Sequence, residues 1–387
     1  MLYIHQLPNW PKLSWDHPTI AALLGPVRHR QGRLLGRMEA LGFTLRSEAV
    51  LQTLTLDIIK SSEIEGEILD ADQVRSSIAR KLGMDIAGLI PSDRHVDGVV
   101  AMMLDATQNY PKALTQERLF GWQASLFPNG YSGMHKIITG AWRDDRKGPM
   151  QVISGPAGRE KVHFEAPKAA RIEKEMKTYL AWFNRPAAPA IQPTEVEPVL
   201  KAGIAHLWFV TLHPFEDGNG RLARAITDMQ LARADGSAQR FYSMSARIRK
   251  ERKAYYEILE TTQKKTQTQG QGVSSSAGID ITAWLEWFLD CLDRALDATE
   301  TTLADVLRKA RFWERYPAES IHERQRTMIH KLFEGFEGKL TSSKWAKIAK
   351  CSQDTALRDI LELVQKGILI KDSAGGRSTS YRLNNIF

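Results

Sequence analysis

The chain has 387 residues, with 53 Lys and Arg against 45 Asp and Glu, and 43% of its residues are hydrophobic. At roughly 150 residues per domain, this length predicts two or three domains with at least one sizeable core. The ordinary shares of charged and aromatic residues exclude collagen-like, coiled-coil and wholly disordered chains. No stretch approaches the ~18 uncharged apolar residues of a membrane helix, and the first residues do not read as a secretory signal. We therefore expect a cytoplasmic, multidomain globular protein with no membrane partner.

Cysteine usage and charge distribution narrow the classes further. Cys291 and Cys351 lie far apart, without a CxxC pattern or nearby histidines, which predicts two reduced thiols rather than a disulfide or a zinc site. The net charge of +8 is uneven, because Ser320–Phe387 holds 12 Lys and Arg against 7 Asp and Glu. Any argument for nucleic-acid binding therefore belongs to the C-terminus.

Three segments predict the central helices. SEAVLQTLTLDIIKSSEIEGE (residues 47–67) repeats apolar residues at helical spacing and has no Pro or Gly before Gly66. VEPVLKAGIAHLWFVTLHPF (residues 196–215) predicts an apolar helix that ends near His213, because Pro214 cannot continue the hydrogen bonding. A third helix should begin inside DGNGRLARAITDMQLARADG (residues 217–236). His206, on the second helix, is expected to be a hydrogen-bonded core histidine, since no third ligand lies at suitable spacing for a metal.

Residues 150–167 are the one clear β region. MQVISG and KVHFEAP are short runs with Val, Ile and Phe, and PAGRE between them supplies the turn of an exposed hairpin. The polar run at 262–278 predicts a flexible linker, and a helical stretch should follow from Ile281 to about Arg311.

The segment His213-Pro-Phe-Glu-Asp-Gly-Asn-Gly-Arg-Leu-Ala-Arg224 holds the groups that a nucleotide phosphate requires. Gly218 and Gly220 allow the backbone to bring N–H groups close to an anion, and the helix that follows adds its positive N-terminus. We expect Asn219 to add a side-chain donor. The two arginines, Arg221 and Arg224, lie three residues apart and can reach phosphate oxygens from one side. Asp217 can supply an oxygen ligand to Mg²⁺, and His213 suits a general base.

This segment resembles the Fic-domain signature HxFx(D/E)GNGRxxR and matches it at every defined position. Ser61-Ser-Glu-Ile-Glu65-Gly66 resembles the inhibitory motif (S/T)xxxE(G/N) of the same family. The hairpin at 150–167 stands where that family has its substrate-positioning flap. The opening segment HQLPNWPKLSWD is similar to an uncharacterised N-terminal module found on some Fic proteins.

The resemblance implies a protein adenylyltransferase that moves AMP from ATP to a side-chain hydroxyl of a target protein or of itself. It implies that His213 deprotonates the hydroxyl, that Asp217 holds Mg²⁺, and that Gly218, Asn219, Gly220 and Arg221 cradle the α- and β-phosphates. The γ-phosphate would contact Arg224. Glu65 would pair with Arg224 and compete with ATP, with Ser61 and Gly66 completing the inhibitory motif.

The C-terminal segment resembles a winged helix-turn-helix. Ser352 predicts the N-cap of its third helix, and the apolar residues expected to form the buried face of that helix are Ala356, Leu357, Ile360, Leu361 and Val364. Two strands around Arg377 would form the wing. The +5 charge favours phosphate contact, whereas Asp354 and Asp359 on the candidate recognition helix do not. DNA binding and protein binding both stay open.

The predicted fold is therefore mainly α: a helical Fic core with a β-hairpin flap and a C-terminal winged helix-turn-helix. The predicted organisation is an N-terminal module carrying the inhibitory helix (1–100), a catalytic core (101–261), a linker (262–280), connecting helices (281–319) and the winged helix (320–387). Two alternatives to the transferase remain, a DNA-binding regulator with a nucleotide-sensing core and an enzyme that removes AMP. The oligomeric state is open, a homodimer included.

Overall fold

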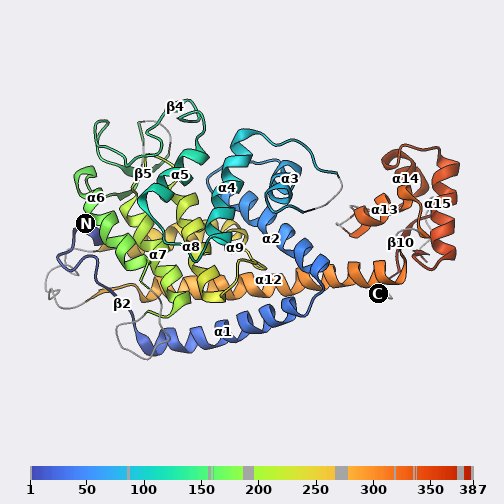
Figure 1. The fold of residues 1–387 in the computed structure, drawn as a ribbon, viewed down its shortest axis with the longest axis horizontal. Coiled ribbons are helices and arrows are strands. Elements are labelled where there is room, and N and C mark those ends of the chain that lie inside the picture. The colour runs from blue at the N-terminus through green and yellow to red at the C-terminus, as the bar shows by residue number, and fades with distance from the viewer. Residues whose placement is uncertain are drawn as a thin grey trace. The chain divides into compact units, whose positions relative to one another are not determined.

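The structure is a computed structural model that describes residues 2–84, 88–155, 158–159, 161–185, 196–265, 278–317, 320–333, 336, 338–372 and 379–384. The described residues are mainly helical, with only short strands, which confirms the predicted fold class (Figure 1). Contacts divide the chain into two compact units, Met1–Thr299 and Glu300–Phe387. No helix in the described ranges is both long and apolar enough to cross a bilayer.

The first unit is built from helices that surround a central pair. Its helices are α1 (His17–Glu39), α2 (Phe43–Ile64), α3 (Ala71–Lys81), α4 (Arg94–Gln108), α5 (Gln116–Leu126), α6 (Ala169–Phe183), α7 (Pro198–Leu212), α8 (Asn219–Asp235), α9 (Met244–Lys250) and α10 (Arg252–Gln263). The long helix α12 (Thr282–Arg315) begins in this unit. Figure 1 shows α7 and α8 at its centre, and they pack closely against each other.

The central pair is buried along almost its whole length. Every residue of α7 from Val199 to Leu212 is buried, and α8 is buried from Arg221 to Ala232. The sequence of α7 is apolar on almost all sides, which places this helix inside a core. In contrast, α8 buries polar side chains such as Arg224, which need partners from the helices around it. α2, α4 and α5 all pack on α8, which brings the end of α2 to the start of α8. The three helices predicted from the sequence are confirmed.

Short strands pair the N-terminal segment of the first unit with the segments on either side of residues 266–277. The N-terminal strands β1 (Leu2–Tyr3) and β2 (Leu13–Ser14) pair with β7 (Lys264–Lys265) and β8 (Ile279–Asp280). The linker predicted at 262–278 is thus too long at its start, because α10 continues to Gln263 and β7 follows it. Residues 266–277 lie outside the described ranges.

Two hairpins lie between α5 and α6. The smaller one joins β3 (Tyr131–Ser132) to β4 (His135–Lys136). The larger one joins β5 (Gln151–Ser154) to β6 (Lys161–Glu165), which confirms the hairpin predicted at 150–167. Residues 156–157 and 160 of its turn are outside the described ranges.

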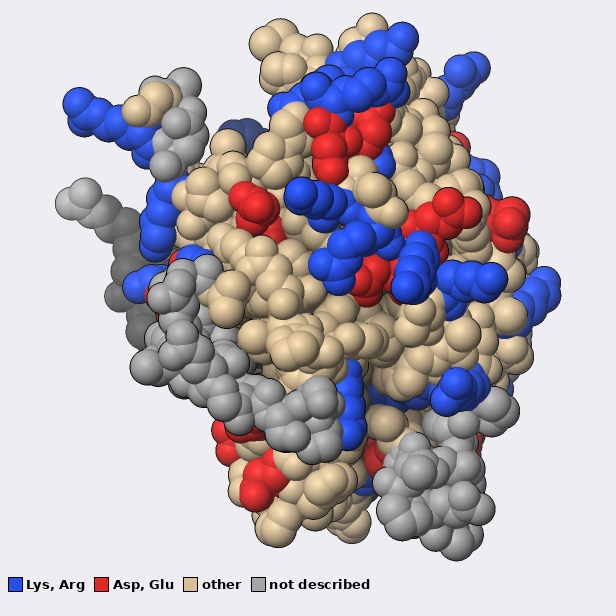
Figure 2. Space-filling model, turned by 90° about the vertical axis from the view of Figure 1, so that its left-hand side faces the viewer, with Lys and Arg blue, Asp and Glu red and all other residues tan. Residues whose placement is uncertain are grey.

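On the face seen in Figure 2, Lys and Arg side chains lie beside Asp and Glu rather than forming a stripe of one sign.

The second unit contains three short helices and one hairpin in the order that the sequence predicts. These elements are α13 (Glu323–Phe333), α14 (Ser342–Ile348), α15 (Gln353–Gln365), β9 (Leu369–Lys371) and β10 (Tyr381–Leu383). Its core includes Phe312 from the end of α12, so the contacts of this unit begin before the predicted boundary at 320. Both cysteines are unpaired, as predicted.

The apolar face predicted for α15 is partly wrong. Ser352 caps the helix by accepting a hydrogen bond from the Thr355 N–H, and Ile360 is fully buried. Leu357 and Leu361, however, are 40% and 52% exposed. Only one stripe of the helix meets the core, and these two leucines lie outside it. Arg377, expected in the wing, lies outside the described residues.

Candidate nucleotide site

The loop between α7 and α8 turns the chain with two left-handed residues. His213 follows α7 with φ 49° and ψ 56°, and Gly218 precedes α8 with φ 89°. The side-chain amide of Asn219 donates to the Phe215 carbonyl at 2.8 Å, and its oxygen accepts from the Phe215 N–H at 3.0 Å. The Asn219 side chain thus holds the loop in shape, and its amide nitrogen keeps a second hydrogen beyond the one donated to Phe215. The backbone N–H groups in the first turn of α8 have no partner within the helix, which is the arrangement that suits an anion.

His213 has the protonation state that a general base needs. Its Nδ1 lies 3.3 Å from the Val210 carbonyl oxygen, so Nδ1 carries the hydrogen and Nε2 keeps the lone pair. Burial lowers the pKa of this imidazole to about 4; the Val210 carbonyl raises it, the Arg143 charge lowers it, and Glu65 and Asp217 raise it. The ring is therefore neutral at pH 7, and Nε2 can accept a proton.

The two acids of the loop hold the small hairpin against it. The Asp217 carboxylate accepts hydrogen bonds from the Gly218 N–H at 2.6 Å and from the Ser132 hydroxyl on β3. Glu216 accepts from the Ile138 N–H at 2.8 Å. Asp217 is therefore the carboxylate at the glycine turn, and the β3–β4 hairpin fixes its orientation.

Arg224 is buried beneath the end of α2. Its Nε donates to the Ser61 hydroxyl at 2.8 Å, and Nη2 donates to the Ser61 carbonyl at 2.9 Å and to Glu65 Oε1 at 2.8 Å. A Cβ at position 220 would lie 2.1 Å from Glu65 Oε1, so a larger residue there would displace the carboxylate from this position. The structure thus pairs Glu65 with Arg224, as predicted, and also places Ser61 and Gly220 against this pair.

Arg221 is held by a second glutamate that the sequence analysis missed. Its Nη1 donates to Glu67 Oε2 at 2.7 Å, and its guanidinium lies over the Phe127 ring. The other oxygen of Glu67 lies 2.5 Å from His95 Nε2. Burial opposes ionisation of Glu67, but His95 and Arg221 outweigh it and lower the pKa of this carboxyl, while Glu67 raises the pKa of His95.

The reason for the pairing of Glu67 lies in the turn after α2. Gly66 has φ 86°, which turns the chain between the two glutamates so that both face α8. The sequence did contain a sign of this second pair: two glutamates, at 65 and 67, flank Gly66, and the signature has two arginines, Arg221 and Arg224, to receive them. Among the described contacts, each motif arginine is held by one of these glutamates.

The larger hairpin, which we call the flap, is anchored mainly through β6. His163 Nδ1 lies 2.6 Å from Glu260 on α10, and Lys264 and His163 together hold the pKa of that carboxyl at about 2 despite partial burial. His5, from the N-terminal segment, contacts the Glu165 carbonyl at 2.8 Å. Ile153 on β5 is 54% exposed. In the flap, β6 is therefore held by contacts with the rest of the unit, whereas β5 exposes an apolar side chain to solvent.

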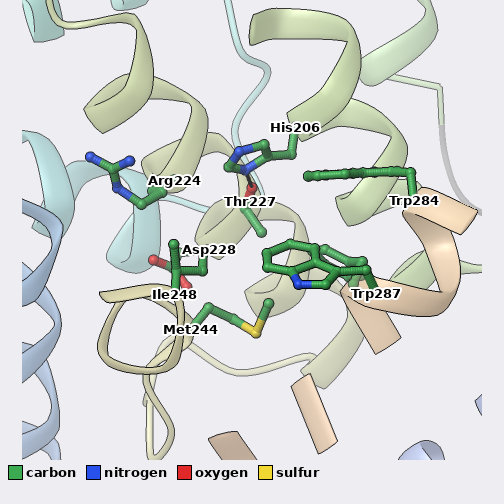
Figure 3. Close-up of a pocket in the computed structure, with 9 residues that line it drawn as sticks. His206, Arg224, Thr227, Asp228, Met244, Ile248, Trp284 and Trp287 are labelled. Atoms are coloured by element: carbon green, nitrogen blue, oxygen red, sulfur yellow. Dashed lines mark hydrogen bonds between the residues drawn. The ribbon is translucent and has the colours of Figure 1, made fainter. Parts of the chain in front are cut away.

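A small cavity lies behind Arg224 (Figure 3). It has a volume of about 10 Å³, room for roughly one water molecule, and is lined by side chains that include His206, Asp228 and Trp284. His206 contacts Thr227 at 2.9 Å and Tyr255 at 2.8 Å, and burial lowers its pKa to about 3. His206 is thus a core histidine, as predicted, and the cavity is too small for a ligand.

Comparison with known proteins matches two segments of the chain. Residues 113–231 match the Fic/DOC family, and residues 3–84 match a family described as "Domain of unknown function (DUF4172)". The chain contains a Fic domain. Ser61, Glu65 and Glu67 lie in the DUF4172 match, whereas the loop and both arginines lie in the Fic match. The site around the arginines is therefore built jointly by the two matched segments.

Curated relatives share part of this chain. It is 26% identical over 244 residues to "Protein adenylyltransferase Fic" of Culex quinquefasciatus, which covers 62% of this chain and 40% of the relative. It is 27% identical over 183 residues to "Protein adenylyltransferase fic-1" of Caenorhabditis elegans, covering 47% of this chain and 32% of the relative. The chain thus spans 40% or less of the length of these two relatives.

Solved structures share its fold. A Fic family protein from Desulfovibrio desulfuricans G20 covers 97% of this chain and 98% of its own, with a TM-score of 0.52 and 21% identity. A Fic domain containing signaling protein from Bacteroides thetaiotaomicron covers 72% of this chain and 95% of its own, with a TM-score of 0.50 and 19% identity. These likenesses agree with a helical Fic fold.

Proposed function

We propose that the Fic domain transfers AMP from ATP to a side-chain hydroxyl of a protein, the chain itself included, and that Glu65 restrains this activity. The relatives' name, protein adenylyltransferase, supports the reaction class. The observation that carries the proposal is the α7–α8 loop. It places a neutral imidazole beside a glycine-rich helix N-terminus and two buried arginines.

In the proposed reaction, the hydroxyl oxygen of the target forms a bond to the α-phosphorus of ATP. The bond between this phosphorus and the bridging oxygen breaks, and pyrophosphate leaves with the electron pair. His213 Nε2 takes the proton of the hydroxyl. The N–H groups at the start of α8, together with Arg221 and Arg224, would stabilise the negative charge of the phosphates.

Magnesium fits the site through one carboxylate. Mg²⁺ commonly binds through one or two carboxylates plus phosphates and water, and the described residues show no larger cluster of metal-ligating side chains. Asp217 would hold it, since each of its oxygens accepts one hydrogen bond and keeps a further lone pair. When bound, Mg²⁺ would neutralise phosphate charge during the transfer.

Glu65 would restrain transfer by occupying Arg224. The Arg224 side chain is 2% exposed and the Glu65 side chain 32%, so the carboxylate is the partner that can leave towards solvent. Burial opposes the charged form of Arg224, but Glu65 raises its pKa, so the guanidinium remains charged. The γ-phosphate of ATP and Glu65 would compete for this donor, and productive binding requires that the pair separates.

Glu67 would add a second restraint at Arg221. Its carboxylate occupies the guanidinium that would contact the α- and β-phosphates, and His95 holds it in place. The two restraints are linked by Gly66, so a movement of the turn after α2 would release both arginines together.

Intact mass spectrometry tests the proposal. Wild-type protein and the Glu65→Gly variant are incubated with ATP and Mg²⁺, and we expect the variant to gain the mass of AMP faster, by roughly ten- to hundredfold. The matched control is Glu63→Ala, which removes a carboxylate of the same segment that pairs with Lys60 rather than with a motif arginine. Equal labelling of wild type and Glu65→Gly would reject inhibition by Glu65. No labelling of any variant, alone or with added protein extract, would reject the transfer.

A further inference from the structure

Arg143 is a buried arginine outside the Fic signature, with a side chain 1% exposed to solvent. Its Nε donates to the carbonyl oxygen of His213 at 2.8 Å, and its backbone N–H donates to the Pro214 carbonyl at 3.0 Å. Both acceptors belong to the left-handed turn that presents the imidazole. A left-handed conformation is unfavourable for a residue other than glycine, so the turn needs contacts that hold it.

The other nitrogens of the same guanidinium contact the segment that follows the flap. Nη2 donates to the carbonyl of Pro167, two residues after β6 ends. Nη1 donates to Asp145 Oδ1 at 2.9 Å, and Asp145 Oδ2 accepts from the Ala169 N–H at 2.6 Å, at the first turn of α6. Three nitrogens of one planar group therefore connect the histidine turn, the flap and α6.

We infer that Arg143 is a positioning residue for AMP transfer, which fixes the turn at His213 relative to the flap so that the imidazole and a hydroxyl held by the flap meet. This inference rests on the proposed function. A guanidinium suits the task because its donors lie in one plane with fixed directions, whereas the ammonium of lysine is a point donor on a flexible stem. Arg143 does not touch substrate in this role.

Packing around Arg143 supports the same role. The preceding residue, Trp142, lies with its ring centroid 5.1 Å from that of Phe215 in the loop and 4.6 Å from that of Phe120 on α5. Phe215 is fully buried. The segment that carries Arg143 is thus fixed to the loop by aromatic contacts as well as hydrogen bonds, and the arginine has little freedom to choose other partners.

Two substitutions separate geometry from charge. Arg143→Lys keeps the positive charge but loses the planar donors, and Arg143→Gln loses both. We expect kcat for self-labelling, measured in the Glu65→Gly background, to fall roughly ten- to hundredfold in both variants, while KM for ATP changes by less than about threefold. The matched control is Arg146, with an 84% exposed side chain that pairs with Asp144, and the same substitutions there should leave kcat unchanged.

The pH profile distinguishes positioning from a general loss of structure. Burial sets the low pKa of His213, the Arg143 charge lowers it further, and Asp217 raises it; Glu65 is absent from the test background. Removing the Arg143 charge raises the pKa, so the acidic limb of kcat/KM should move to higher pH in Arg143→Gln but not in Arg143→Lys. An identical limb in both variants would contradict the closeness of the Arg143 charge to His213, on which the inference rests.

Asp145→Asn gives a second route to the answer if the Arg143 variants do not fold. It weakens one arm of the guanidinium network from a position that is partly exposed, and a smaller fall in kcat is expected at unchanged KM for ATP. If the Glu65→Gly parent shows no transfer, the proposed function fails. If the parent transfers AMP and both folded Arg143 variants match its kcat, the inference fails and the proposed function stands.

Discussion

The molecule places positive charge in two different settings. In the Fic site, the side chains of Arg221 and Arg224 are 6% and 2% exposed, and each faces a glutamate that is about one-third exposed. In the C-terminal unit, the excess of Lys and Arg lies on the surface or forms local pairs such as Arg324 with Asp359. A buried cation opposite an exposed carboxylate is ready to exchange that carboxylate for another anion. A basic surface alone does not indicate which anion, if any, it binds.

The exposed face of α15 sharpens this contrast. If the unit read DNA, the candidate recognition helix would present polar and basic residues to base edges. It presents Leu357 and Leu361, which are partly exposed, together with Asp354 and a single arginine, Arg358. The positive charges of the chain therefore do not support one common ligand. The arginines of the site favour nucleotide binding, whereas the exposed face of α15 gives DNA binding no support.

The largest expected effect is at the base. His213→Ala in the Glu65→Gly background should reduce the rate of AMP transfer by about 10²–10⁴-fold, because no other neutral imidazole lies on the loop. ATP binding, measured by calorimetry, should change by less than about threefold, since the arginines and the loop remain. A variant that keeps the parent's rate would remove His213 from the chemistry.

The second effect compares neighbours in the C-terminal unit. Ile360 is fully buried and Leu361 is 52% exposed, although both were predicted on one apolar face. Ile360→Ala should lower the free energy of unfolding of this unit by about 2–4 kcal/mol, and Leu361→Ala by less than about 0.5 kcal/mol. Hydrogen exchange of α15 amides in the full chain measures both, and equal losses would show that Leu361 is covered.

A smaller effect is expected from the second glutamate. Glu67→Gln keeps the shape of the side chain but removes its charge from Arg221 and His95. Initial rates of self-labelling should rise by about two- to fivefold over wild type, less than for Glu65→Gly, because Arg224 stays occupied. Glu257→Gln, on α10, provides the matched loss of a carboxylate at a side chain that is 64% exposed and pairs with Lys253. A rate below wild type would mean that Glu67 assists ATP binding.

The smallest expected change is with pH. The lowered pKa of His213, about 4, keeps the base neutral from pH 6 to 8. The value of kcat/KM for the Glu65→Gly variant should therefore stay within about twofold across this range and fall only near pH 4, as the ring gains its proton. An unperturbed imidazole with a pKa of about 6.5 would give a clear loss below pH 7, and that profile would contradict the structure.

The parts of the structure that sequence could predict are those specified by local chemistry. Pro214 ends α7, the glycines turn the loop, and the alternation of MQVISG and KVHFEAP makes a hairpin. The pairing of Glu65 with Arg224 was predicted from two motifs far apart in sequence. These features are set by few residues and short spacings.

Other features depend on long-range packing that one sequence does not display. The role of Arg143 depends on contacts with the histidine turn and with the end of the flap, which are 24 or more residues away in the sequence. Glu67 acquires its role from the turn at Gly66 and from His95 on α4. The contacts of the Asn219 side chain with the Phe215 backbone were not predicted from the sequence. The face of α15 that meets the core likewise follows from the neighbours of the helix.

The central claim is that this chain moves AMP, not phosphate, and that Glu65 holds the activity down. It is tested most directly by incubating wild-type and Glu65→Gly protein with Mg²⁺ and ATP labelled on either the α- or the γ-phosphate. We predict that the α-label becomes attached to protein, far more in Glu65→Gly than in wild type, and that the γ-label does not. Attachment of the γ-label, or equal attachment of the α-label to both proteins, would contradict the account.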